Sequence, residues 1–221
     1  MSLSGFSSCE ISDALIKLSL PHGGHIPDIH LVSPVNSDLR LCGPAYTVQF
    51  VLASDPSAPK LTTHFVDTVP EGSVILLDVP PQTKNAVWGG LMTAGALARG
   101  AKGVIISGRC RDIAEHRAQG FPVFSRAHST LGQSPFTRPS AVNIPLTIIP
   151  QGPGADVFPA VTVQPGDWLI ADEDGVVCIP KDLEAQVVEL AIKGREIDDR
   201  CMKDIQAGKG VQQSFKLHRG K

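Results

Sequence analysis

The alternation of helical and strand patterns over residues 88–126 constrains the fold more than any other feature of this sequence. The first helix of this region opens at a glycine pair, and the second closes at Gly120. The two strands are short and apolar, which is typical of buried strands. In chain order the helix, strand, helix and strand are GGLMTAGALARG, KGVIISG, DIAEHRAQG and FPVFSR. This order predicts a mixed α/β domain in which helices flank a central sheet.

The remaining segments predict more strands and three further helices. Ser7 and Glu10 match a capping box before apolar residues at helical spacing, which predicts a helix that ends near Leu20. A short helix is predicted over 61–69, and a charged one begins near Asp182. Residues 126–141 lack a sustained period, so we expect an ordered surface loop there, and long loops are often functional. Strands are predicted near 29–33, 45–53, 73–79, 142–149, 155–163, 166–172 and 175–180.

The length of 221 residues suits one well-packed domain, and no linker that could separate two domains is visible. We expect residues 1–207 to form a single α/β domain. Residues 208–221 are expected to be a C-terminal tail that is flexible or packed on a neighbouring subunit.

The composition argues against several classes of partner. The chain is 42% hydrophobic and 19% charged with a formal net charge of −2, so it lacks the basic excess of a nucleic-acid binder. No apolar run approaches the length of a membrane span, and the first twenty residues lack an export signal. Five cysteines occur without a CxxC pair, which favours reduced thiols. We expect a cytoplasmic protein with no nucleic-acid or membrane partner.

The turn at the end of GVIISGRCRD carries the first candidate site. A strand followed by a helix delivers side chains to a crevice where the helix presents unpaired N–H groups. Arg111 suits a bidentate contact with a carboxylate, and Asp112 is a hard oxygen ligand for a divalent cation. The alternative is equally open: Asp112 caps the helix, and Arg111 is its solvated neighbour.

The glycine pair Gly89-Gly90 is the second candidate. Without Cβ atoms these residues let a substrate approach the backbone amides of Leu91 and Met92 at a helix N-terminus. A plain helix-entry turn explains the pair as well.

Other reactive residue types are weaker candidates. Lys60, Lys84 and Lys102 show no sign of the desolvation that a Schiff-base lysine needs. Cys110 has no partner histidine that the sequence can place beside it, so an inert thiol is favoured. No histidine has zinc-site spacing. Of His64, His116 and His128, His128 lies in the long loop, where an exposed histidine is favoured over one that borders the pocket. Arg109 is as well suited to a second substrate carboxylate as to a surface role.

At these motifs the chain resembles the family of 4-hydroxy-4-methyl-2-oxoglutarate aldolases and the related regulators of ribonuclease E activity, the RraA-like proteins. The segment from NAVWGG to FPVFSR resembles the family signature, and GDWLIADEDGVVCIP resembles its later DGVV stretch. The resemblance covers about Gly43 to Gln206, and HSTLGQSPFTRPSAVNIP is similar to fungal members.

The resemblance implies a fold, a cofactor and an assembly. The fold is a swivelling-type sheet or barrel core flanked by helices, assembled as a homotrimer or a dimer of trimers. A divalent cation, Mg²⁺ or Mn²⁺, is bound by Asp112 and mostly by water, and a C-terminal acidic residue of an adjacent subunit, of which we favour Glu196, completes its surroundings. Arg111 and the amides of Leu91 and Met92 bind the carboxylate of a small 2-oxo acid.

The implied activity is that of a class II aldolase that cleaves a 4-carboxylated 2-oxo acid through a pyruvate enolate, or decarboxylates oxaloacetate by the same chemistry. Two alternatives stay open: a non-catalytic regulator that binds proteins, and a lyase specialised for another acid in a secondary pathway. The chain departs from the family pattern at Gly90, where many members have an acidic residue, and at Ser107 and Lys60. These departures leave the substrate and the proton relay undetermined.

Overall fold

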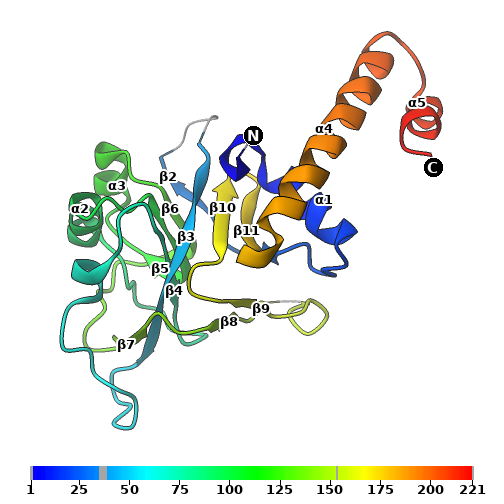
Figure 1. Ribbon diagram of the computed structural model, residues 1–221. Coiled ribbons are helices and arrows are strands. Elements are labelled where there is room, and N and C mark those ends of the chain that lie inside the picture. The colour runs from blue at the N-terminus through cyan, green and yellow to red at the C-terminus, as the bar shows by residue number, and fades with distance from the viewer. Residues whose placement is uncertain (1, 35–38, 153, 221) are drawn as a thin grey trace.

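The computed structural model describes residues 2–34, 39–152 and 154–220. It contains a nine-stranded mixed sheet, a separate two-stranded sheet and helices at both ends of the larger sheet (Figure 1). The helices are η1 (Leu3–Gly5), α1 (Ser8–Lys17), η2 (Phe65–Thr68), α2 (Gly90–Ala98), α3 (Ile113–Gln119), η3 (Lys181–Leu183), α4 (Glu184–Gln206) and α5 (Val211–His218). The strands are β1 (His25–Ile26), β2 (His30–Ser33), β3 (Leu41–Leu52), β4 (Val74–Asp78), β5 (Gly103–Cys110), β6 (Val123–His128), β7 (Thr137–Val142), β8 (Leu146–Ile148), β9 (Val161–Val163), β10 (Trp168–Asp172) and β11 (Gly175–Ile179).

Strand β3 holds the large sheet together because it pairs with three others. Its first residues pair antiparallel with β10, its middle pairs parallel with β4, and its end pairs antiparallel with β7. The order of the main path is β1-β11-β10-β3-β4-β5-β6-β2, and the pairs from β3 to β6 are parallel. The mixed α/β class expected from the sequence is confirmed.

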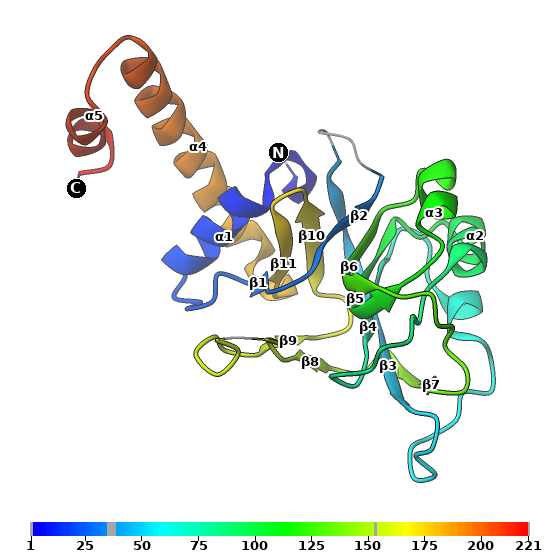
Figure 2. The same ribbon diagram turned by 180° about the vertical axis from the view of Figure 1, so that it is seen from behind.

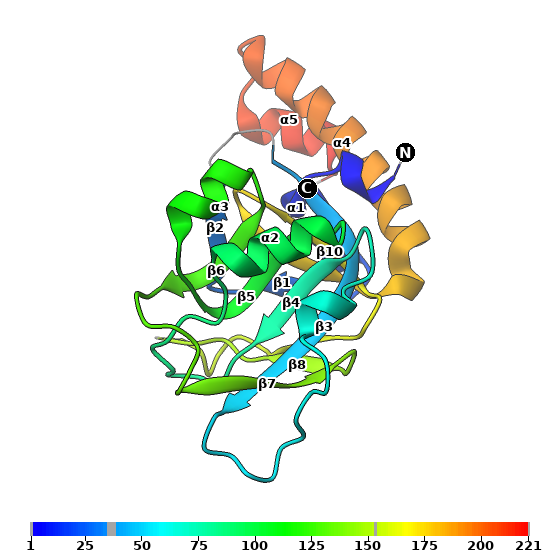
Figure 3. The ribbon, with the colours of Figure 1, turned by 90° about the vertical axis from the view of Figure 1, so that its left-hand side faces the viewer.

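Helices α2 and α3 are the crossovers of this parallel region. Each leads from one strand to the next, from β4 to β5 and from β5 to β6, and both cover one face of these strands (Figure 3). The core beneath them includes a group of aromatic rings among aliphatic side chains, and in it Trp88 stacks on Phe121 with ring centroids 6.3 Å apart. This packing fixes the ends of both helices relative to the sheet.

The sequence placed most elements well and a few wrongly. The capping box of Ser7 and Glu10 is present, although α1 ends at Lys17 rather than near Leu20. The helix predicted over 61–69 is only the 3-10 turn η2. Within the predicted loop, β7 forms because it pairs with β3, and its polar sequence hides this. Of the strand predicted over 155–163, only β9 exists, because the preceding residues form turns.

The C-terminal segment forms a helical hairpin. Helix α4 extends beyond the sheet, and α5 turns back against it (Figures 1 and 2). Asp204 binds the side chains of Lys209 and His218 at the turn, and Ser214 of α5 is buried beside Cys201 of α4. The sequence did not predict α5, because its polar surface matches that of an exposed tail. No helix in the described part of the chain is long and apolar enough to cross a membrane, and all five cysteines are free.

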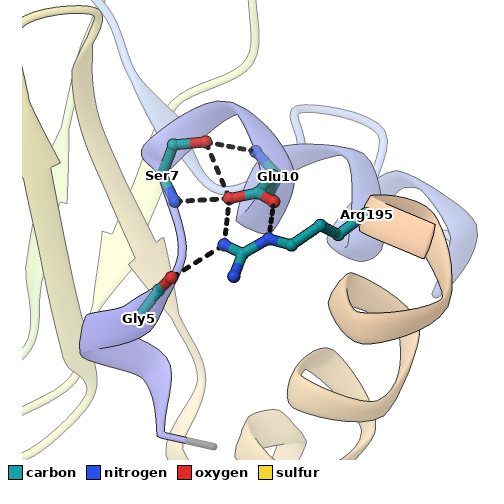
Figure 4. Close-up of polar contacts among 4 residues, drawn as sticks. All are labelled: Gly5, Ser7, Glu10 and Arg195. Carbon is teal, nitrogen blue, oxygen red and sulfur yellow. Dashed lines mark hydrogen bonds and ion pairs between the residues drawn. The ribbon is translucent and has the colours of Figure 1, made fainter. Parts of the chain in front are cut away.

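Arg195 joins α4 to the N-terminal segment (Figure 4). Its Nε and Nη2 donate to the two carboxylate oxygens of Glu10 at 2.6 and 2.7 Å, and Nη2 also donates to the carbonyl of Gly5 at 2.7 Å. Its guanidinium lies 4.5 Å from the centre of the Phe6 ring. The Arg195 bonds hold the pKa of Glu10 below its usual range. This two-pronged ion pair is the main polar contact between α1 and α4 in the described residues.

We predict that Glu10→Gln lowers the free energy of unfolding at pH 7 by about 1–2 kcal/mol, because a bidentate charged contact becomes a neutral one. Since folding lowers the pKa of Glu10, its contribution is present above about pH 4.5 and is lost at lower pH. Urea unfolding at pH 7 and pH 3.5 measures both effects. The same change in the exposed Glu189–Lys193 pair, Glu189→Gln, is the control and is expected to have little effect. Equal losses at both pH values would contradict the assignment.

Candidate functional site

The N-terminus of α2 and the turn before α3 lie side by side. The segment before α2 runs parallel to the end of β5: Val87 N–H donates to the carbonyl of Arg109, and Arg111 N–H donates to the carbonyl of Trp88, both at 2.9 Å. The two sequence motifs, separated by twenty residues, therefore form one site.

Asp112 has an unusual backbone and an unusual hydrogen-bond partner. It adopts the left-handed conformation, with φ 60° and ψ 41°, which is uncommon for a residue with a side chain. Its side chain does not cap its own helix, α3. Instead, Oδ2 accepts the N–H of Gly90 at 3.0 Å, and the Nε of Arg111 lies 3.6 Å away. Asp112 therefore occupies the N-cap position of α3, as one interpretation of the sequence expected, but its side chain caps the neighbouring helix α2.

The two glycines are needed for space. A Cβ added to Gly89 would lie 2.5 Å from Asp112 Oδ2, and one added to Gly90 would lie 1.5 Å from Glu115 Oε2. Neither glycine has a positive φ, so backbone freedom does not explain them. Because Gly89 and Gly90 have no side chains, the carboxylates of Asp112 and Glu115 can lie against their backbone. We call this space the glycine cradle. A plain helix-entry turn does not account for this arrangement.

Arg111 is available for a ligand. Its side chain is 46% exposed, and its terminal nitrogens have no acceptor among the described residues. A Cβ at Gly132 would lie 2.9 Å from Arg111 Nη1, so the loop after β6 passes directly against the guanidinium. The loop borders the site, as expected for a functional loop.

The backbone amides at the start of α2 differ from one another. Gly90 N–H is bound by Asp112, and Met92 N–H donates to the carbonyl of Gly89 at 3.0 Å. Within the described chain, Leu91 N–H has no acceptor, and its side chain is 82% exposed. Leu91 is therefore the amide that remains free to meet a substrate at this helix N-terminus.

A buried hydrogen-bond chain locks α2 onto α3. The indole N–H of Trp88 donates to the hydroxyl of Thr93 at 2.9 Å, and that oxygen lies 2.9 Å from Nδ1 of His116. All three side chains are buried, and burial lowers the pKa of His116, so its ring is neutral near pH 7. This link could not be predicted from the sequence, because its members become neighbours only when the helices pack.

The structure keeps Glu196 away from this site within one chain. Glu196 is exposed on α4, which packs on α1 at the opposite end of the sheet from α2 and α3 (Figures 1 and 2). It can meet Asp112 only in an assembly of several chains, so its role stays a prediction.

The other candidates have structural partners. Arg109 donates to the carbonyls of Thr83 and His128, and Lys102 donates to the carbonyl of Cys42. The Cys110 thiol is buried 3.3 Å from the Ser125 hydroxyl, and burial raises its pKa, as an inert thiol requires. His64 caps η2.

A second polar group lies at the ends of β4, β5 and β6, and the sequence interpretation missed it. Asp78 ends β4 and borders a cavity of about 330 Å³ together with Ser107. Arg126 donates through Nε to the Ser107 hydroxyl at 3.3 Å, and its side chain is 7% exposed. Burial raises the pKa of Asp78 to about 6, against the opposing effects of Ser107 and Arg126. The sequence feature that could have indicated this group is an acidic residue, Asp78, at the end of the apolar run of β4.

A divalent cation fits the chemistry of the Asp112 region. Hard cations prefer carboxylate and water oxygens, and because residues 89 and 90 are glycines no Cβ of theirs crowds the carboxylates of Asp112 and Glu115. No three Asp, Glu, His or Cys side chains of the described residues converge on one point. A cation here would be held by one carboxylate of this chain together with water and any ligand from a second copy.

Comparison with known proteins decides the family. The RraA-like family, described as Aldolase/RraA, matches residues 8–178. The chain belongs to the RraA-like family. A relative from Halalkalibacterium halodurans, named "Putative 4-hydroxy-4-methyl-2-oxoglutarate aldolase", is 30% identical over 77% of this chain and 73% of its own length.

Two further proteins extend the comparison. Protein DlpA of Legionella pneumophila is 30% identical over 94% of this chain, which spans only about a third of that protein, 32%. The crystal structure of Streptomyces coelicolor RraAS2, titled an unusual member of the RNase ES inhibitor RraA protein family, superposes with a TM-score of 0.74 at 21% identity. The match covers 89% of this chain and 91% of RraAS2 and shows a shared fold.

We predict that Asp112→Gly is more stable to unfolding than Asp112→Ala by about 1 kcal/mol, because only glycine adopts the left-handed conformation without strain. Both variants remove the carboxylate, so the difference isolates the backbone. Denaturant unfolding of the two proteins measures it. Equal stabilities would show that the turn relaxes out of this conformation.

The raised pKa of Asp78 predicts how the stability of the fold changes with pH. Its pKa in the folded protein lies above the ordinary value of 3.8, so its stabilisation is complete below about pH 3.8 and is lost as the pH rises through 6. We expect Asp78→Asn to gain stability relative to the unaltered protein by about 1–3 kcal/mol between pH 4 and pH 7.5. Urea unfolding across this range tests it. A difference that stays constant with pH would refute the assignment.

Proposed function

We propose that this RraA-like protein is a divalent-metal-dependent lyase that cleaves a short 4-carboxylated 2-oxo acid and releases pyruvate. One observation carries the proposal: the half-exposed guanidinium of Arg111 and the carboxylate of Asp112 meet at the N-terminus of α2, and the terminal nitrogens of Arg111 have no acceptor in the described residues. A cation-binding oxygen beside an anion-binding arginine suits a substrate that chelates a metal through a carboxylate and the adjacent carbonyl.

Arg111 would hold the substrate carboxylate with two parallel N–H bonds. Its side chain is open to solvent, and the loop at Gly132 limits its movement. The N–H of Leu91 and the positive end of α2 would bind a further substrate oxygen. Together these groups would fix the 2-oxo acid in one orientation.

Asp112 would hold the metal, and Glu196 of a second copy would complete its surroundings in a homotrimer or a dimer of trimers. When bound, Mg²⁺ or Mn²⁺ supplies a Lewis acid that polarises the 2-oxo carbonyl. The bond from Gly90 N–H to Asp112 Oδ2 leaves the other carboxylate oxygen free and fixes the direction in which it points. The left-handed backbone conformation of Asp112 thus lies at the point where the metal would bind.

Two substrates fit the proposal: 4-hydroxy-4-methyl-2-oxoglutarate, which the names of several relatives mention, and oxaloacetate. Both carry a carboxylate at C4 and yield pyruvate. A non-catalytic regulator and a lyase for another acid are the alternatives, and the assay below separates the proposal from both.

The test is pyruvate release from each acid by metal-stripped protein, with and without added Mg²⁺ or Mn²⁺. We expect metal-dependent turnover that falls at least about 100-fold in Asp112→Asn and in Arg111→Lys. Asp112→Asn removes the charged ligand of the metal, and Arg111→Lys keeps the charge but removes the two-pronged contact with the substrate carboxylate. Glu196→Gln should lower turnover as well. Arg117→Lys, on the exposed face of α3, is the matched control for Arg111→Lys and should leave turnover unchanged.

Turnover that needs no metal, or that survives Asp112→Asn, would refute the metal-lyase assignment. No turnover of either acid by folded, metal-bound protein would favour a different acid or a regulatory role.

A further inference from the structure

We infer that Glu115 is a second acidic group of this site and holds a water molecule of the divalent cation that Asp112 binds. The inference rests on the proposed function, because it assumes a cation at Asp112. It also explains why residue 90 is a glycine.

The observation is the position of the Glu115 carboxylate. A Cβ on Gly90 would lie 1.5 Å from Oε2 of Glu115, 2.6 Å from its Cδ and 3.1 Å from its Cβ. The carboxylate therefore occupies the space in which a side chain of residue 90 would begin. Gly90 thus does not leave the site without an acid: the acid comes from α3 instead of α2.

The spacing in α3 explains why two carboxylates reach the same place. Asp112 is the residue directly before α3 and Glu115 lies in its first turn, so both carboxylates are at the N-terminal end of this helix. Asp112 Oδ2 faces Gly89, and Glu115 Oε2 faces Gly90. The hydrogen bonds from Trp88 through Thr93 to His116 fix the two helices, so this pairing is a property of the fold.

The charge of Glu115 is not compensated within the chain. Its carboxylate makes no hydrogen bond or ion pair in the described residues, and Glu115 is exposed. The Arg111 side chain pairs with Asp112 instead, since its Nε lies 3.6 Å from Asp112 Oδ2. The two carboxylates face adjacent residues, Gly89 and Gly90, so a cation bound beside Asp112 would also attract the negative charge of Glu115. The glycine cradle and the uncompensated charge are independent observations that point to the same ligand.

The cation expected here keeps several water ligands, because few protein ligands converge on it. A carboxylate that accepts hydrogen bonds from such waters strengthens binding without contacting the metal. Glu115 is therefore a positioning residue of the metal site.

The experiment measures Mn²⁺ binding to the full chain by the electron paramagnetic resonance signal of free Mn²⁺, without substrate. We expect Glu115→Gln to weaken Mn²⁺ binding about tenfold, with an unchanged melting temperature, and Asp112→Asn to abolish it. Glu173→Gln, an equal change at an exposed glutamate in the β10–β11 turn, is the matched control and should bind as the unaltered protein does.

A double-mutant cycle tests the geometry. Gly90→Ala should weaken Mn²⁺ binding, because its Cβ displaces the Glu115 carboxylate, and should have no further effect in a Glu115→Ala background. Additive effects would overturn the inference.

The outcomes separate the two proposals. If Asp112→Asn abolishes Mn²⁺ binding while Glu115→Gln matches the Glu173→Gln control, the role of Glu115 is wrong and the metal site stands. If Asp112→Asn leaves Mn²⁺ binding unchanged, both proposals fail.

Discussion

The hydrogen bond from Gly90 N–H to Asp112 Oδ2 is the interaction on which the site depends. It is a cap made between two helices, so it exists only while α2 and α3 keep their relative position. A glycine at residue 89 is needed to let the carboxylate approach, and a left-handed turn is needed to aim it. The buried side chains of Trp88, Thr93 and His116 maintain that position from within the core. The geometry of the site therefore depends directly on the packing of α2 and α3 in the core.

The sequence predicted the features that depend on near neighbours. The capping box at Ser7, the crossover helices and the motif at Arg111 follow from local spacing, and each lies where it was expected. The position of Glu115 could not be predicted, because only the packing of α3 against α2 brings its carboxylate to Gly90. Polarity misled the interpretation at β7 and α5. Strand β7 is stabilised by its pairing with β3, and helix α5 by its packing against α4, more than by the hydrophobic pattern of their own residues.

The site is open on one side. Arg111 and Leu91 are largely exposed, and Glu115 faces solvent with no partner in the described chain. A lyase needs a site that excludes water from the reacting carbonyl. The exposed surface around α2 therefore agrees with a site that a second copy of the chain completes.

The shared strand β3 has a consequence for how the protein folds. Its pairing with β10, β4 and β7 links segments from both ends of the chain. Because β3 cannot detach from one partner without weakening the others, no part of the large sheet forms an independent folding unit, and its central amides should exchange with solvent only on global unfolding. The pairs β1–β11 and β10–β3 join residues more than a hundred positions apart, so folding must close long loops early and will be slow for a chain of this size.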